Sequence, residues 1–213
     1  MIAQVDSLLR ARGRFAVGRG PVPLRWLALL LSTCGFLYGA AMGAFDVRAT
    51  QSLYSGLKVP LLLACSTLVC LPNFFAVNTF LGLRDDFDAA LRAVLSAQAT
   101  VAVALCSMSP LILTVYLSSD DYRFAILMNG VFFALATLAG QWTLTRHYAP
   151  LVRSNPRHRV CRLAWILLYV FVAIQLAWVL RPFIGDPGAP TTFFRAEAWS
   201  NAYVVIVRDV LGW

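Results

Sequence analysis

The residues of this chain that could do chemistry are few, and the clearest are two histidines. His147 and His158 lie in one Arg-rich stretch, eleven residues apart, with no Cys, Asp or Glu between them. A metal site usually draws several Cys, His or carboxylate ligands from closely spaced positions, so this pair is weak evidence for a metal. Binding of lipid headgroups by the arginines around them is the better interpretation. The candidate headgroup ligands are Arg153, Arg157, Arg159 and Arg162.

Catalytic groups are missing from the most apolar parts of the chain. Five long runs contain no Asp, Glu, Lys, Arg or His: residues 26–45, 59–83, 93–117, 124–145 and 163–180. Catalysis within a membrane needs a nucleophile with a base, paired carboxylates or metal ligands. Serines such as Ser66 and Ser96 have no base beside them and are expected to pack or to bond their own helix. We therefore predict a protein that is not an enzyme and that has no cofactor.

Amide side chains are the polar groups that these runs do contain. Counted from the nearer end of each run, they fall into two layers at similar depth: Asn78, Gln98 and Gln141 in one, Asn129 and Gln175 in the other. Hydrogen bonds between helices, worth about 0.6 kcal/mol each, are the favoured interpretation. The alternative is a polar path for a neutral solute.

Each run must be a helix that crosses a bilayer. The hydrocarbon core is roughly 30 Å thick, and about 20 apolar helical residues cross it. Hydrophobic residues form 60% of the chain and charged residues 13%, against roughly 45–50% and about 25% in soluble domains. We predict an all-α, polytopic bundle of five transmembrane helices in one domain, residues 26–180, between a basic segment, 1–25, and a C-terminal segment, 181–213.

The net charge of +8 is best explained by orientation. With the N-terminus inside, twelve of the 18 Arg and Lys residues are cytoplasmic and six are outside. Positive charge concentrates in short cytoplasmic loops, so we predict a bacterial inner-membrane protein with its N-terminus inside and its C-terminus outside. The same charge suits anionic lipids, and nucleic acid is not an expected partner.

The first run carries a glycine face. Gly35, Gly39 and Gly43 recur at four-residue spacing, so they share one side of a helix and let another backbone approach closely. Packing within the chain is the favoured interpretation. A homo-oligomer or another membrane subunit is the alternative.

Both terminal segments are expected to be amphipathic helices at the membrane surface. Residues 2–17 place apolar side chains at helical spacing among arginines, which suits either a lipid surface or a docked partner. Residues 181–190 hold three prolines and two glycines and should be extended. The helix expected over 193–211 presents one stripe, for which we predict partner docking: Trp199, Tyr203, Ile206, Val210 and Trp213.

A family resemblance spans residues 57–117. Leu57-Lys58-Val59-Pro60, Leu71-Pro72-Asn73, Gly82 and Pro110 together resemble the bacterial branch of the Yip family. Its members have five spans, a cytoplasmic N-terminus and an outside C-terminus. The resemblance implies a membrane adaptor without known catalysis.

The features combine into one functional hypothesis with two alternatives. The glycine face, the terminal helices and the lack of catalytic groups favour a non-catalytic scaffold or accessory subunit of a larger membrane complex. A channel or transporter for a small neutral or amphiphilic solute is the first alternative. A lipid-handling protein is the second.

Overall fold

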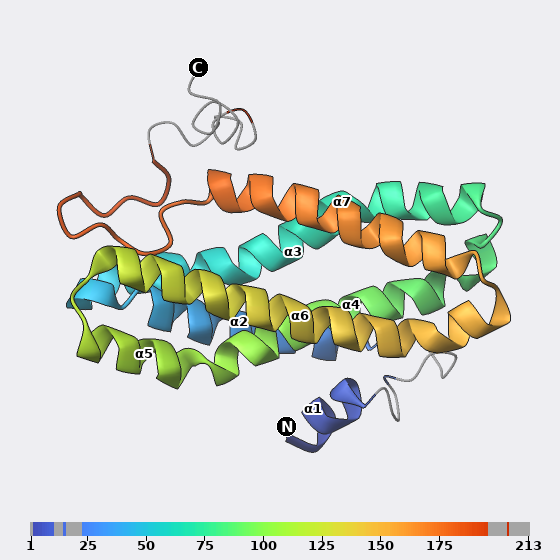
Figure 1. Cartoon of the computed structure of the whole chain (residues 1–213), viewed down its shortest axis with the longest axis horizontal. Coiled ribbons are helices and arrows are strands. Elements are labelled where there is room, and N and C mark those ends of the chain that lie inside the picture. Colours follow the sequence, from blue (N-terminus) through green and yellow to red (C-terminus); the bar gives the residue numbers. More distant parts are fainter. Residues whose placement is uncertain (1, 11–14, 16–22, 196–203, 205–213) are drawn as a thin grey trace.

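The structure is a computed structural model that describes residues 2–10, 15, 23–195 and 204. All regular structure in these residues is helical (Figure 1). The elements in order are α1 (Ile2–Leu9), α2 (Leu24–Met42), the 3-10 turn η2 (Phe45–Val47), α3 (Ala49–Phe80), the 3-10 turn η3 (Arg84–Asp86), α4 (Phe87–Ser107), α5 (Ser109–Ser118), α6 (Tyr122–Ser154) and α7 (His158–Val179).

Five helical segments are long and apolar enough to cross a membrane, and they form an all-α bundle. They are α2, α3, the segment Arg84–Ser118 that contains α4 and α5, α6, and α7. Within the bundle α2 packs on α3 and α4, α4 on α6, and α7 on α3 (Figure 1). The prediction of a multi-pass bundle with five spans is confirmed.

The bundle has two ends, which we call the basic end and the strap end. The basic end holds the start of α2, the turn between α3 and α4, and the turn between α6 and α7. The opposite end holds the start of α3 and the segment 180–195, which follows α7 and is not helical; we call this segment the strap and its end of the bundle the strap end.

The second predicted span starts ten residues too late. We expected it at 59, whereas α3 begins at Ala49. Gln51, Ser55 and Lys58 in the added turns are polar, so an apolar run cannot reveal them, yet all three are fully buried. They are helical and buried because α2 and the strap cover them, as described below.

Residues 146–162, which separate the fourth and fifth predicted spans, are mostly helical rather than a loop. Helix α6 continues through Pro150 to Ser154 and α7 begins at His158, so only residues 155–157 connect them. Proline inside a helix removes a hydrogen bond. Burial of Tyr148 and Leu151 in one apolar cluster with Trp165 of α7 offsets that loss and extends both helices.

The third span consists of two helices. The sequence predicts one helix over 93–117, but α4 ends at Ser107 and α5 begins at Ser109. Proline lacks a donor N–H and fits the first turn of a helix, where no intrahelical acceptor is needed. Pro110 accordingly opens α5. Pro72, in contrast, lies within the uninterrupted α3.

The glycine face of α2 lies against the first turns of α3. A Cβ atom built on Gly39 would be 2.2 Å from the carbonyl oxygen of Ser55 and 2.9 Å from Cα of Gly56. A Cβ on Gly43 would be 2.6 Å from the carbonyl oxygen of Gln51, and one on Gly35 3.3 Å from Cβ of Pro60. The two backbones therefore touch, and the close approach occurs within the chain.

A single added methyl group should separate these helices. Gly39→Ala places its Cβ inside the Ser55 carbonyl, so we expect the free energy of unfolding to fall by about 1–3 kcal/mol, as in overpacked cores. The measurement is the thermal unfolding midpoint in mild detergent. Gly130→Ala is the matched control, because a Cβ there has no atom within 4 Å; an equal effect at both positions would contradict the contact.

Candidate functional site

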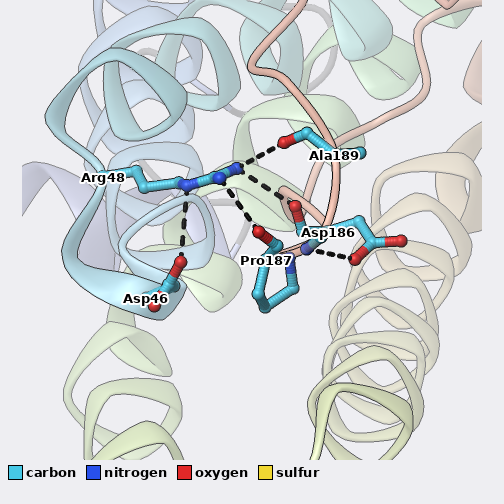
Figure 2. Close-up of polar contacts among 6 residues, drawn as sticks. Asp46, Arg48, Asp186, Pro187 and Ala189 are labelled. Carbon is cyan, nitrogen blue, oxygen red and sulfur yellow. Dashed lines mark hydrogen bonds and ion pairs between the residues drawn. The ribbon is translucent and has the colours of Figure 1, made fainter.

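The strap is held to the bundle by the residue just before α3. Arg48 donates through Nη1 to the carbonyl oxygens of Asp186 (3.0 Å) and Ala189 (2.9 Å), and through Nη2 to that of Pro187 (3.1 Å). Its Nε lies 3.3 Å from the carboxylate of Asp46. Figure 2 shows the guanidinium inserted between η2 and the strap, with all four contacts in place. One side chain thus binds three carbonyl groups of the strap within residues 186–189.

Buried polar groups of α3 hold the first part of the strap. Lys58 donates through Nζ to the carbonyl oxygen of Pro182 at 2.6 Å. Gln51 donates to the carbonyl oxygen of Phe183 at 2.9 Å, and the Ser55 hydroxyl donates to the same oxygen. Backbone carbonyls of the strap therefore supply the partners that these buried groups need.

A cavity of about 740 Å³ lies beneath the strap; we call it the strap cavity. Its volume is within the range of about 300–1,000 Å³ typical of small-molecule sites. The lining comes from five parts of the chain: α2 (Met42), α3 (Gln51, Leu62), α6 (Tyr122, Ile126, Asn129, Gly130, Phe133), the end of α7 (Ala177), and the strap (Arg181, Pro182, Phe183, Ile184, Gly185, Asp186, Ala189, Pro190, Thr192, Arg195).

The part of the strap cavity lining that α6 contributes is exposed. Ile126 lines the cavity and is also 47% exposed. Beside it, a side chain on Gly130 would meet no atom within 4 Å. Helix α6 is long and apolar enough to cross a membrane, so the cavity borders an exposed, apolar part of a membrane-spanning segment.

Two arginines give the cavity a cationic side. The guanidinium carbons of Arg181 and Arg195 lie 3.4 Å and 4.3 Å from the centroid of the Trp178 ring. Two of the three guanidinium nitrogens of Arg181, Nε and Nη2, are buried and donate no hydrogen bond. Burial, and then the charge of Arg195, lower the pKa of Arg181. Arginine stays protonated even so, which leaves a desolvated positive charge at the cavity.

The deep side of the cavity is a closed polar network. Asn129 accepts a hydrogen bond from the Tyr38 hydroxyl (2.9 Å) and donates to the Tyr116 hydroxyl (2.7 Å). Tyr116 in turn donates to the carbonyl oxygen of Met42 (2.9 Å). Asn129 therefore joins α2, α5 and α6 while it lines the cavity.

The amide side chains of the two predicted layers have different surroundings in the structure. Gln98 and Gln141 line one small cavity of about 80 Å³ together with Tyr169. Asn78 lies apart and donates to the carbonyl oxygen of Phe74 in its own helix. Gln175 lies half-buried on α7 and, like Asn78, lines neither cavity. Leu62 and Phe133 line both cavities and stand between them.

The basic end uses its histidines separately. His147 donates through Nε2 to the carbonyl oxygen of Leu8 in α1 (3.1 Å), whereas His158 contacts Asp86 (3.1 Å). The two histidines therefore have different partners. Of the predicted headgroup ligands, Arg153, Arg157 and Arg159 are exposed and Arg162 is half-buried. Arg157 also donates to the carbonyl oxygen of Leu81 at the end of α3 (3.3 Å).

Several ionisable side chains that lie outside the predicted spans are buried in the protein. Lys58, Arg92, His147 and His158 are each at most 3% exposed. A search confined to apolar runs misses such groups because the helices extend past those runs. Arg181 was missed for a different reason: an arginine just after a span is ordinarily a signal of orientation. The predicted docking stripe, Trp199, Tyr203, Ile206, Val210 and Trp213, lies outside the described residues.

Comparisons with protein-family models, curated proteins and solved structures gave no match. The resemblance to the Yip family stays a prediction.

Removal of the Arg48 guanidinium should release the strap. Arg48→Gln loses three charge-assisted hydrogen bonds, each worth about 1.5–3 kcal/mol where shielded from solvent and less at an exposed site. We expect amide hydrogen exchange in peptides covering 181–195 to accelerate by about tenfold or more. Arg123→Gln, an exposed arginine at the same end, is the control. Unchanged exchange in Arg48→Gln would mean that the α3 contacts alone hold the strap.

Proposed function

We propose that this chain is a lipid-handling membrane protein that takes an amphiphilic molecule from the bilayer into the strap cavity. The observation that carries the proposal is the combination, in one cavity, of an exposed apolar wall at Ile126 and Gly130 with a cationic side at Arg181 and Arg195. An acyl chain needs the first and a polar headgroup the second.

A path for a neutral solute has less support. The strap cavity and the small cavity at Gln98 and Gln141 are separated by the bulky side chains of Leu62 and Phe133. The polar groups beside this separation, at Asn129, bond one another in a closed network. A blind cavity that opens sideways suits capture of a membrane component better than flow across the membrane.

The role of scaffold or accessory subunit stays a prediction. One of the surfaces that suggested it, the face with Gly35, Gly39 and Gly43, is covered by α3 of the same chain. The C-terminal stripe lies outside the described residues. A lipid-handling protein can also belong to a complex, so the two roles are compatible.

Filling the cavity should reduce amphiphile binding. Leucine at position 130 adds four carbons to space that is empty, and each buried CH2 of a ligand contributes about 0.8 kcal/mol. We therefore expect Gly130→Leu to weaken binding by about tenfold or more. The measurement is photo-crosslinking, in proteoliposomes, of a phospholipid with a photoactivatable acyl chain to peptides of α6 and the strap.

The matched control is Ala134→Leu, one turn further along α6. Ala134 is exposed and lines neither cavity, so the same side chain there should leave crosslinking to the strap unchanged. Equal crosslinking in wild type and Gly130→Leu would contradict the proposal.

We propose that the basic end faces the cytoplasm of a bacterial cell, which places the strap cavity in the outer leaflet of the inner membrane. The support is the distribution of Arg and Lys residues between the two ends.

Orientation can be tested by thiol labelling in intact cells. With the five native cysteines replaced by alanine, an impermeant reagent should label Asp120→Cys, at the strap end, and should not label Asn155→Cys, at the basic end. Labelling after lysis controls for reactivity. The reverse pattern would put the strap cavity in the inner leaflet.

A further inference from the structure

We propose that Arg181 and Arg195 bind the phosphate of the amphiphile's headgroup, so that the ligand of the strap cavity is a phospholipid. This inference rests on the proposed function and adds the chemical class of the ligand. It concerns residues to which the sequence analysis gave no role.

The geometry of the two arginines is the first argument. Both guanidinium carbons lie close to the same indole ring, that of Trp178, at 3.4 Å and 4.3 Å from its centroid. They are therefore at most about 8 Å apart, a separation at which like charges out of bulk water repel appreciably. Contact with the ring stabilises each cation. An anion that contacts both guanidinium groups would attract each of them and offset the repulsion.

Unmet hydrogen-bonding capacity is the second argument. A guanidinium has five N–H donors in a planar fork, and an unpaired donor shielded from water costs free energy. Nε and Nη2 of Arg181 are buried and donate to no acceptor. A phosphate offers several acceptor oxygens in the geometry that arginine binds with two parallel hydrogen bonds. A neutral hydroxyl headgroup has no charge with which to compensate the guanidinium.

One carboxylate, that of Asp186, also lines the cavity, and its Oδ1 accepts the backbone N–H of Gly188 at 2.9 Å. The two arginines outnumber it among the lining residues, so the charged side chains of the lining favour an anionic headgroup.

The source of the phosphate is a lipid rather than a soluble ester. The apolar lining that α6 contributes is exposed at Ile126 and Gly130, and a soluble phosphate ester would leave these apolar residues uncovered. The acyl chain of a phospholipid covers these apolar residues, while its phosphate reaches Arg181 and Arg195.

The test compares two lipids with the same acyl chains, of which only one has a phosphate in its headgroup. The full chain, delipidated in mild detergent, is titrated with phosphatidylglycerol and with diacylglycerol of the same acyl chains, and bound ligand is measured by native mass spectrometry. We expect phosphatidylglycerol to bind about tenfold or more tightly, the gain expected for one charge-assisted hydrogen bond. Arg181→Gln and Arg195→Gln should each remove most of this preference, and Arg181→Lys should retain part of it.

Arg123→Gln is the control for a change of net charge and should keep the full preference. Equal affinity for both lipids, with both lost in Gly130→Leu, would overturn the phosphate assignment and leave the proposed function standing. If neither lipid binds, or if Gly130→Leu does not weaken the binding, both the phosphate assignment and the proposed function are overturned. Displacement of phosphatidylglycerol by glycerol 3-phosphate at similar concentration would assign the site to a soluble ester. Should Arg181→Gln fail to fold, the wild-type preference and Arg195→Gln still decide.

Discussion

The contact between α2 and the first turns of α3 is the constraint on which the rest of the structure depends. Because Gly39 has no side chain, the Ser55 carbonyl lies where a Cβ would be, and the helices meet backbone to backbone. That approach encloses Gln51, Ser55 and Lys58, which would be costly to bury without partners. The strap supplies the partners with its carbonyl groups, and the strap in turn forms one side of the cavity.

The strap cavity combines order and open space. Arg48, Lys58 and the Asn129 network fix the strap and the ends of α2, α5 and α6 with hydrogen bonds. Alongside these fixed parts, the wall at Gly130 is left unfilled. A preformed cavity with a rigid polar side and an open apolar side loses little conformational entropy on binding a flexible ligand.

The five spans could be predicted because length and apolarity are local properties of the sequence. The glycine spacing of Gly35, Gly39 and Gly43 likewise identified a close-packed face. The start of α3 and the extension of α6 could not be predicted, since Lys58 and His147 are polar and become buried only through contacts with Pro182 and Leu8. The cavity was out of reach for the same reason: Arg181 and Gly130 are 51 positions apart in sequence, and only the fold brings them together.

The hydrogen bonds between α3 and the strap also constrain the order in which the chain can mature. Lys58 and its acceptor at Pro182 are separated by 124 residues, and Arg48 and Ala189 by 141. A ribosome makes the chain from its N-terminus, so α3 enters the membrane long before its partners exist. Its polar first turns must stay hydrated at the membrane surface until α7 has been inserted. Docking of the strap is therefore a late step in biogenesis, and a truncated chain that ends before it would leave a buried lysine without an acceptor.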